Sequence, residues 1–575
     1  MSVLICNVIV ADADGIGDEA SDVLIDGGRI VRVGAAGTLA DASDASDASD
    51  GSGAPHRIDG RGRLLMPGFI DAHSHADGAL FDPDVQFALL RQGVTTVIGG
   101  QDGVSYAPGG GDYATEYFAA INGRHPGYRG GGVASLLAAY DGATALNAGY
   151  LVPAGTVRFV VCGRSTDVPT PAELTAMRAL VVEGLAEGAL GISTGLDYAP
   201  GIFASTGELA ELAGLVADAG GVYVSHMRGG YEANSGDGIA EIAAIAHASG
   251  ARVHVSHFHA EPQLVHGLLA SLAAEGIDAS FDAYPFTRGC SMLAMPLLPA
   301  ALTVRPTAEV VAELADPAAR ARLRAEWFPG IAGYASLGPD WPSMLTLAHV
   351  AAPGYDWAHG LTIAQGAAAA SARAAANGVA GGAARDRGGP GGPVDTIDAI
   401  DFALDVLVAS NLEVNVVMSV QHERSDAELA EILAHPAAIG GSDGIFLGRH
   451  PHPRARGSFS RFLSLLVREQ SVMDWAGASA LVSARAAARF GLGERGAVRE
   501  GFIADLVLVD PDAVRATSTY DSPLGLGVGI DDVLVAGVPV LAGSELTGAT
   551  PGRGIRRASA DSAALGSGPL VSEEA

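Results

Sequence analysis

The sequence predicts an α/β protein: a (β/α)8 TIM-like barrel joined to a small composite β-sandwich that both chain ends form. From residue 64 to about 490, short apolar runs alternate with longer amphipathic segments, as in βα units with parallel strands. Strand-like runs with a Gly-Gly turn precede this region at 3–34, and strand-like composition returns at 496–548. Two β segments that flank one barrel are expected to share a single β domain.

Eight apolar runs are candidate barrel strands. They are 64–75, 94–102, 157–163, 188–194, 221–227, 252–258, 278–286 and 439–444. Between them, segments such as 171–188 and 236–250 carry Leu, Ile, Val and Ala at helical spacing and end in glycine, which favours a left-handed helix cap. We expect these segments to be outer helices of the barrel.

The same patterns divide the chain into regions. The interval between the last two predicted strands is longer than a crossover needs, and its Ala- and Gly-rich stretch 367–393 predicts an inserted subdomain with a flexible arm. The repeat DASDASDASD at 41–50 predicts a solvated loop. The predicted regions are an N-terminal part of the β-sandwich at 1–61, the barrel at 62–490 with an insertion at about 300–430, a C-terminal part of the sandwich at 491–557 and a disordered tail at 558–575.

Charge and cysteine content exclude several classes of protein. With 65 acidic side chains against 35 basic ones, the net charge of −30 repels phosphate backbones and anionic lipids, so neither nucleic acid nor a membrane is an expected partner. The 3 cysteines are too few for a disulfide framework and lack Cys-x-x-Cys spacing. The N-terminus lacks the features of a signal peptide, and no later apolar run is long enough to span a bilayer. We therefore expect a cytoplasmic protein.

Polar residues recur where the predicted strands end. In a (β/α)8 barrel these ends converge on the face that holds the active site. His73 and His75 follow the first strand, and residues two apart on a strand point to the same side, so both imidazoles can reach one ion. The other strand-end residues are Asp102, His226, His257 and Asp443.

This set of residues predicts a metal site. A single buried histidine is more often a hydrogen-bonded core residue, and a strand-end aspartate is often a helix N-cap. Four histidines and two carboxylates at the ends of five apolar strands would require repeated burial of costly polar groups without a reward. Nitrogen and oxygen ligands suit zinc, although manganese, cobalt or nickel also fit. We expect one or two divalent metal ions, with zinc as the first choice.

Longer motifs are more specific than the His-x-His pair. They are LLMPGFIDAHSHAD (64–77), VTTVIGGQDGVSYAP (94–108), GALGISTGLDYAPG (188–201), YVSHMRG (223–229), VHVSHFH (253–259), FDAYPF (281–286), IGGSDG (439–444), HPHPRARGSFSRFL (450–463) and TGATPGRGIRR (547–557). Together they resemble the D-aminoacylase (N-acyl-D-amino-acid deacylase) family of the amidohydrolase superfamily. The resemblance runs nearly from end to end and implies metal-dependent hydrolysis of the amide bond of small N-acyl-D-amino acids.

The resemblance also implies roles for individual residues. The metal ligands would be His73, His75, Asp102, His226, His257 and Asp443. Asp443 would in addition be the catalytic general acid and base. Tyr198 and Arg454 match positions that hold the substrate carboxylate, a task for which a guanidinium can make two parallel hydrogen bonds.

Two positions depart from the family pattern. Asp102 stands where the family commonly has a cysteine metal ligand, and this harder oxygen donor weakens the preference for zinc. His259, assigned to substrate binding, stands where the family usually has a lysine, so the group that it recognises can differ.

Two alternatives stay open. One is another hydrolase on the same scaffold, such as a dipeptidase, a cyclic-amide hydrolase or a carbamoyl hydrolase, because fold does not fix substrate. No lysine lies in the candidate strands, which disfavours the members that use a carbamylated lysine. The other is a non-catalytic relic of the scaffold. The sequence also leaves the oligomeric state open, a homo-oligomer included.

Overall fold

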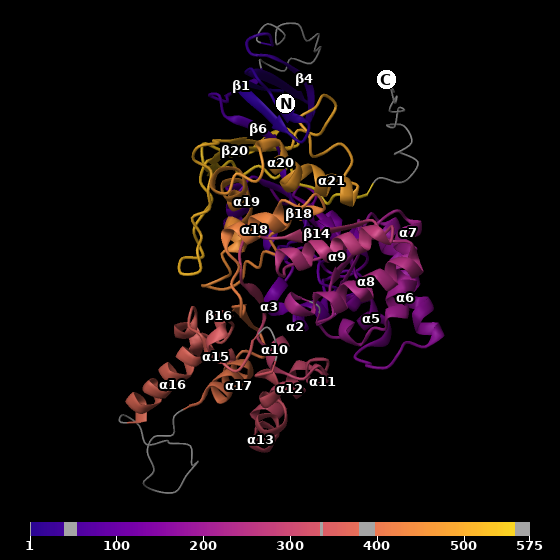
Figure 1. Cartoon of the computed structure of the whole chain (residues 1–575), viewed down its shortest axis with the longest axis vertical. Coiled ribbons are helices and arrows are strands. Elements are labelled where there is room, and N and C mark those ends of the chain that lie inside the picture. The colour runs from indigo at the N-terminus through magenta and orange to yellow at the C-terminus, as the bar shows by residue number, and fades with distance from the viewer. Residues whose placement is uncertain (1, 40–54, 230, 334–336, 379–396, 558–575) are drawn as a thin grey trace.

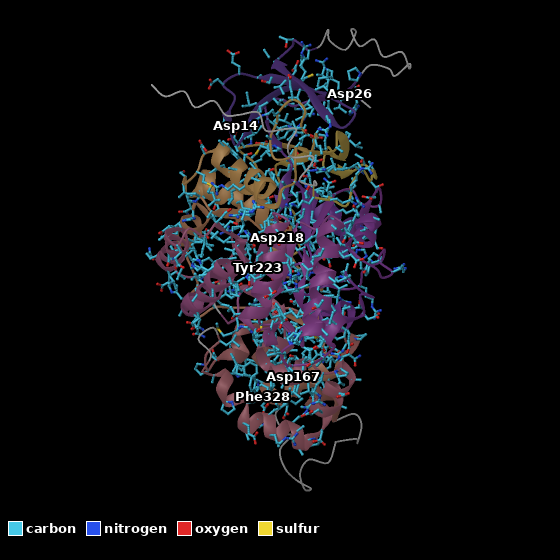
Figure 2. All side chains as sticks on the ribbon, turned by 90° about the vertical axis from the view of Figure 1, so that its right-hand side faces the viewer. Asp14, Asp26, Asp167, Asp218, Tyr223 and Phe328 are labelled. Carbon is cyan, nitrogen blue, oxygen red and sulfur yellow. The ribbon has the colours of Figure 1, made fainter. Side chains whose placement is uncertain are left out.

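The computed structural model describes residues 2–39, 55–229, 231–333, 337–378 and 397–557. These residues form three tiers along the long axis: a β-sheet at one end, a barrel in the middle and a mainly helical unit at the other end (Figure 1). A view turned by 90° shows the same order, with Tyr223 in the barrel and Phe328 in the helical unit (Figure 2). The predicted loop at 41–50 and the predicted tail at 558–575 lie outside the described residues.

Eight parallel strands of the described chain form the barrel. They are β7 (Phe69–Asp71), β8 (Val94–Gly99), β9 (Asn147–Tyr150), β11 (Gly191–Gly195), β12 (Val222–His226), β13 (Arg252–Val255), β14 (Ala279–Ala283) and β18 (Ala438–Gly440). The ring closes where the backbone N–H of Ala72 donates to the carbonyl of Gly440 at 3.1 Å, and the Leu190 N–H to that of Tyr150 at 2.9 Å. The predicted (β/α)8 fold is confirmed.

Capping interactions mark the ends of the outer helices. Helix α6 (Pro171–Ala186) starts with a capping box, in which Thr170 and Glu173 satisfy each other's backbone N–H groups. Helix α8 (Ser235–Ser249) ends at Gly250, whose φ of 70° is the left-handed conformation that glycine tolerates. The outer helices predicted at 171–188 and 236–250 are confirmed.

The predicted third strand at 157–163 is wrong, because these residues belong to helix α5 (Ala154–Cys162). The β-branched run Val-Arg-Phe-Val-Val favoured a strand by composition. The burial pattern is helical: Ala154, Val157 and Arg158 are buried, whereas Val160 is 46% exposed. The third barrel strand is instead β9, whose short sequence Asn-Ala-Gly-Tyr has weak strand propensity.

Both chain ends build one ten-stranded sheet, in the order β22-β21-β20-β19-β6-β1-β3-β4, with β2 and β5 paired to β1. Its strands are β1 (Val3–Asp12), β2 (Gly15–Ile16), β3 (Ser21–Asp26), β4 (Arg29–Ala35), β5 (His56–Asp59), β6 (Leu64–Pro67), β19 (Leu506–Val509), β20 (Ile530–Val535), β21 (Val538–Ala542) and β22 (Glu545–Leu546). Leu65 in β6 pairs with Val10 on one side and Leu508 on the other. The composite β domain made by both ends is thereby confirmed.

The insertion forms its own small unit. Strands β15 (Gly289–Met292), β16 (Leu345–Val350) and β17 (Val414–Met418) pair antiparallel. Its helices are α10 (Ala294–Leu297), α11 (Ala300–Thr303), α12 (Thr307–Ala315), α13 (Pro317–Glu326), α14 (Phe328–Ile331), α15 (Trp341–Met344), α16 (Ile363–Gly378) and α17 (Ala399–Ala409). They enclose an apolar cluster separate from that of the barrel. Residues 367–378 of the predicted flexible arm are helical instead, because alanine is the strongest helix former.

Two further helices matter for the site: α3 (Ala119–Asn122), and α19 (Arg454–Leu463), which begins at a predicted substrate residue. None of the helices in the described residues has the length and apolarity that crossing a membrane requires.

Candidate metal centre and cavity

The first pair of site histidines follows strand β7. The Nδ1 of His73 lies 3.3 Å from Oδ2 of Asp282 in β14, and the Nδ1 of His75 lies 3.0 Å from Oδ1 of Asn122 at the end of α3. Each partner can accept a hydrogen bond from Nδ1–H, which leaves Nε2 as the free lone pair. Both Nε2 atoms therefore point inward as possible metal ligands.

The second pair comes from the next part of the barrel. His226 ends β12 and His257 follows β13, and the Nδ1 of His226 lies 3.0 Å from the Nε2 of His257. The other nitrogen of His226, Nε2, lies 3.2 Å from Oδ2 of Asp197. The backbone N–H of His257 donates to Asp282 at 2.8 Å. Asp282 thus supports one histidine of each pair.

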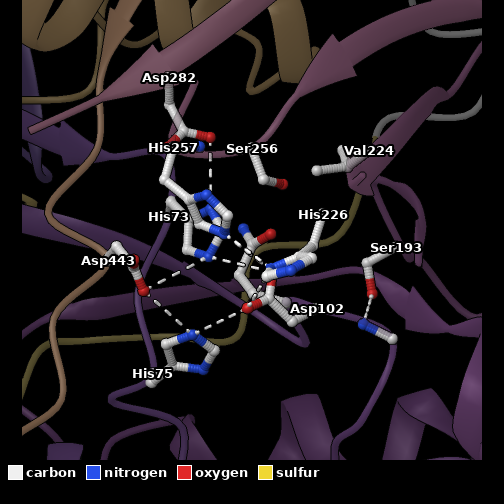
Figure 3. A network of polar contacts seen from close by, with 12 residues as sticks. His73, His75, Asp102, Ser193, Val224, His226, Ser256, His257, Asp282 and Asp443 are labelled. Carbon is white, nitrogen blue, oxygen red and sulfur yellow. Dashed lines mark hydrogen bonds and ion pairs between the residues drawn. The ribbon is translucent and has the colours of Figure 1, made fainter. Parts of the chain in front are cut away.

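Asp102 lies between the two pairs (Figure 3). Its Oδ1 is 3.6 Å from His73 Nε2 and 3.7 Å from His257 Nε2. Its Oδ2 is 3.6 Å from His75 Nε2 and 3.6 Å from His226 Nδ1. The structure therefore contains two three-residue ligand sets that share one carboxylate: His73, His75 and Asp102, and Asp102, His226 and His257.

The backbone at this site is held in an uncommon conformation. Asp102, His257 and Asp443 have positive φ values of 54°, 34° and 47°. Such values are rare outside glycine and cluster at functional sites, where the surrounding fold compensates for the strain. Gly195 allows one of these bends, because a Cβ there would lie 2.0 Å from the carbonyl oxygen of Asp102.

Asp443 lies beside the first ligand set. Its Oδ1 is 3.3 Å from His75 Nε2 and 3.9 Å from His73 Nε2, and its Oδ2 is 2.7 Å from Nη2 of Arg454. Burial works against the charge of this carboxylate, but the Arg454 guanidinium holds its pKa below the usual range. Asp443 is therefore ionised at neutral pH and can accept a proton.

The site favours positive charge at its centre. Burial opposes protonation of the imidazoles, yet Asp102 and its neighbouring carboxylates raise the pKa of His75 and of His226 to about 10. Conversely, the surrounding histidines hold the pKa of Asp102 well below its usual range despite burial. The carboxylates at this site therefore favour a positive charge among the ligand sets.

A metal ion fits this set of donors. His73 Nε2 and Asp102 Oδ1 are buried without a hydrogen-bond partner among the described residues, which is costly unless another group satisfies them. Histidine nitrogen and carboxylate oxygen are ordinary ligands of zinc and of other first-row divalent ions. A carboxylate with two oxygens can serve both ligand sets, as Asp102 is placed to do.

A cavity of about 470 Å³ opens beside the ligand sets. The predicted substrate residues Tyr198, His259 and Arg454 all line it, together with Asp102 and Asp443. Tyr198 shares a hydrogen bond of 3.0 Å with the hydroxyl of Ser291. The ring of His259 stacks on that of Tyr231, with 5.2 Å between the ring centroids, and burial lowers the pKa of His259 to about 4. The structure thus places the nine predicted site residues close together, in the ligand sets and along the cavity beside them.

The guanidinium of Arg454 is buried and only partly paired. The residue is fully buried, its guanidinium carbon lies 4.5 Å from the ring centroid of Tyr284, and Nη2 contacts Asp443. Its Nε and Nη1 have no hydrogen-bond partner among the described residues. Unpaired, charged N–H groups on a residue that lines the cavity can donate charge-assisted hydrogen bonds to a carboxylate.

Several contacting residues were missed by the sequence prediction. Asp282 and Asp197 contact histidines of the ligand sets, Asn122 contacts His75, and Glu232 lines the cavity. Asp282 could have been found, because an aspartate inside the apolar strand Ala-Ser-Phe-Asp-Ala is a buried charge that needs a partner. The other three lie in loops or at a helix end, where polar residues are ordinary.

The family model for amidohydrolases matches residues 57–335 and 347–541 of the chain. The chain belongs to the amidohydrolase family. It is 29% identical over 569 residues to an N-acyl-D-aspartate deacylase of Alcaligenes xylosoxydans xylosoxydans, covering 96% of this chain and 94% of that protein. The resemblance to D-aminoacylases predicted from the motifs is confirmed.

Solved structures extend this family relationship. The N-acyl-D-glutamate deacylase of Bordetella bronchiseptica, in complex with zinc and a phosphonate that mimics the tetrahedral intermediate, matches with a TM-score of 0.72. A D-aminoacylase with a binuclear metal centre also matches with a TM-score of 0.72. Each is 26% identical to this amidohydrolase and covers 96% of it and 99% of the solved chain. The shared fold thus extends over the barrel, the composite sheet and the insertion.

Proposed function

We propose that this amidohydrolase cleaves the amide bond of N-acyl-D-amino acids, releasing a carboxylate and a free D-amino acid. The observation that carries the proposal is the pair of ligand sets sharing Asp102, with Asp443 and Arg454 beside them at one cavity. The relatives named above support the reaction type and the D configuration.

The proposed metal ligands are His73, His75, Asp102, His226, His257 and Asp443. One or two divalent ions, zinc first among them, are supported by the two ligand sets and by the zinc and binuclear centres of the solved relatives. A divalent ion at such a site lowers the pKa of water and polarises a carbonyl oxygen.

Asp443 is the proposed catalytic residue. Its carboxylate, ionised beside Arg454, accepts the proton of the attacking water and then donates it to the leaving amine nitrogen. The same group therefore acts first as a general base and then as a general acid. Its position 3.3 Å from His75 Nε2 keeps this proton transfer next to the ligand sets.

Arg454, Tyr198 and His259 form the proposed substrate-binding group. The guanidinium of Arg454, whose Nε and Nη1 have no partner among the described residues, binds the α-carboxylate of the substrate, and Tyr198 lines the same cavity. Fixing the α-carboxylate on one side and the amide at the ligand sets on the other selects the stereoisomer whose amide can reach the reacting groups.

We also propose a cytoplasmic location, which the unpaired Cys6, Cys162 and Cys290 support. Light scattering tests whether the protein forms a homo-oligomer.

Amine release from matched N-acetyl D- and L-amino acids tests this function. The enzyme is stripped of metal and reloaded with zinc, manganese, cobalt or nickel. We expect metal-dependent release confined to the D-substrates. Turnover only of dipeptides or cyclic amides would instead assign a different amidohydrolase reaction, and metal binding without any turnover would indicate a non-catalytic relic.

A further inference from the structure

The charge of one cavity wall differs from that around Arg454. This wall is formed by loops that follow strands β11, β12 and β13 and contains Asp197, Glu232 and His259. Arg454 is the sole arginine or lysine among the described residues that line the cavity. A second anionic group on the substrate therefore meets no free cation along this wall.

The carboxylate of Glu232 forms an ion pair with the guanidinium of Arg424. Both of its carboxylate oxygens contact Nη1 of Arg424, at 2.8 and 2.9 Å. The Arg424 side chain is 1% exposed and does not line the cavity, whereas Glu232 is 24% exposed and does. The guanidinium thus lies behind the carboxylate, so the cavity faces the negative partner of the ion pair.

Two neighbours add to this arrangement. His259 donates from Nδ1 to the carbonyl of His257 at 2.6 Å, which directs its Nε2 toward Glu232 at 3.6 Å. Asp197, also 24% exposed, accepts the backbone N–H of Gly229 at 2.7 Å. This wall thus presents two carboxylates to the cavity, and the guanidinium that pairs with Glu232 lies behind it, while Asp197 lies beside the imidazole of His226.

We propose that Glu232 is a specificity-determining residue that selects substrates carrying a positive charge on their variable part and rejects those with a second carboxylate. The proposal rests on the proposed function, because it concerns the same cavity. In this partly desolvated wall, an ammonium group gains a charge-assisted hydrogen bond to Glu232, whereas a carboxylate is repelled. Rejection of the wrong charge is a common source of specificity.

The positive charge can come from either side of the amide bond. An amino-acid side chain can carry it, as in Nα-acetyl-D-lysine, or the acyl group can carry it, as in the free amine of glycyl-D-leucine. Matched neutral substrates separate the two sources: Nα-acetyl-D-norleucine for the first and acetyl-D-leucine for the second. Nα-acetyl-D-glutamate reports on rejection of an anion.

The experiment measures kcat/KM for these five compounds with the metal-loaded enzyme. We expect one cationic compound to exceed its neutral partner by about tenfold or more, the range of one charge-assisted hydrogen bond, and the glutamate compound to be the poorest. Equal rates within both pairs, or preference for the glutamate compound, would overturn the proposal.

A pair of variants assigns the effect to Glu232. Glu232→Gln removes the charge that faces the cavity and should bring the cation-to-neutral ratio close to one. Glu423→Gln is the matched control, because Glu423 is 53% exposed, binds Arg288 and does not line the cavity. An unchanged ratio in Glu232→Gln, or an equal loss in Glu423→Gln, would refute the role of Glu232.

Failure of the proposed function gives a different result from failure of this inference. If none of the compounds is turned over, calorimetric binding of the same five compounds to the metal-loaded enzyme still ranks them by charge. A cation preference in binding that Glu232→Gln abolishes would support the inference even then. Binding without any charge preference would overturn it.

Discussion

Asp443 combines three features that its proposed role in proton transfer needs. It is nine-tenths buried or more, it is paired with Arg454 at 2.7 Å, and it lies beside the first ligand set. Both three-residue ligand sets are complete without it. Its proposed role in proton transfer can therefore be separated from metal binding by substitution.

Asp443→Asn should lower kcat by about two to four orders of magnitude, because an amide cannot accept the water proton. At least one ion should stay bound, since neither three-residue set contains Asp443. Turnover and metal content are measured on the same preparation, and circular dichroism checks the fold. Turnover within tenfold of the unaltered enzyme would remove Asp443 from its catalytic role.

Asp197 positions His226 through the nitrogen that faces away from the ligand sets. Asp197→Asn replaces the charged acceptor with a neutral one, so the orientation of the imidazole is less fixed. Loss of such a partner typically costs about 10- to 100-fold in metal affinity. Competition with a chelator in the absence of substrate measures this affinity. Asp167→Asn, at an exposed position, is the control and should bind metal as tightly as the unaltered enzyme.

The site residues were largely predictable, and their supporting partners were not. His73, His226 and Asp443 are polar residues at the ends of apolar strands, a pattern visible in one sequence. Asn122 and Glu232 reach the site only through the packing of a helix end and a loop. Their sequence neighbourhood carries no period or motif that places them there.

Among the elements, strands with a buried side-chain run were easiest to predict. Strands β12, β13 and β14 each fall within a predicted run, because parallel strands covered on both faces read as continuous apolar sequence. Helix α5 was mistaken for a strand because its β-branched residues have a high strand propensity. Tertiary packing overrides this propensity and makes the segment helical. Short β9, with glycine and asparagine, gave no comparable signal.

The loop before helix α4 (Val133–Tyr140) depends on a neutral histidine. His125 is buried, its Nδ1 accepts the backbone N–H groups of Gly127 and Tyr128, and its Nε2 lies 3.1 Å from the Tyr140 hydroxyl. Nδ1 can accept these bonds only when it carries no proton. Burial and, to a lesser degree, Arg129 lower the pKa of His125 from 6.5 to about 4.

This histidine should make the enzyme less stable as pH falls from about 6.5 to about 4. Between these values the unfolded chain binds the proton and the folded loop does not, so the free energy of unfolding decreases with falling pH. The full difference is about 3 kcal/mol. Thermal midpoints at pH 7, 5.5 and 4.5 are compared with those of His125→Gln, which should lose less stability over this range. Parallel pH profiles of the two proteins would contradict the assignment.

At the scale of the whole molecule, the C-terminal segment joins the chain ends to the barrel. The backbone N–H of Ala148 in β9 donates to the carbonyl of Arg553 at 2.9 Å, and that of Ile555 donates to the carbonyl of Ala148 at 2.7 Å. Ile555 is buried in a cluster that includes Leu190 and Phe490. The segment from residue 547 to 557 thus covers an edge of the barrel that β9 leaves incompletely paired.

A chain that ends at residue 546 should therefore be less stable than one that ends at Arg557, which keeps all of these contacts. Removing the segment leaves backbone groups of β9 without partners and exposes Ile555's apolar neighbours, a loss of several kcal/mol. For a domain of this size we expect the thermal midpoint to fall by about 5 °C or more. Differential scanning calorimetry of the two metal-loaded chains measures the difference. Equal midpoints would mean that β9 holds its place in the barrel through β8 and β11 alone.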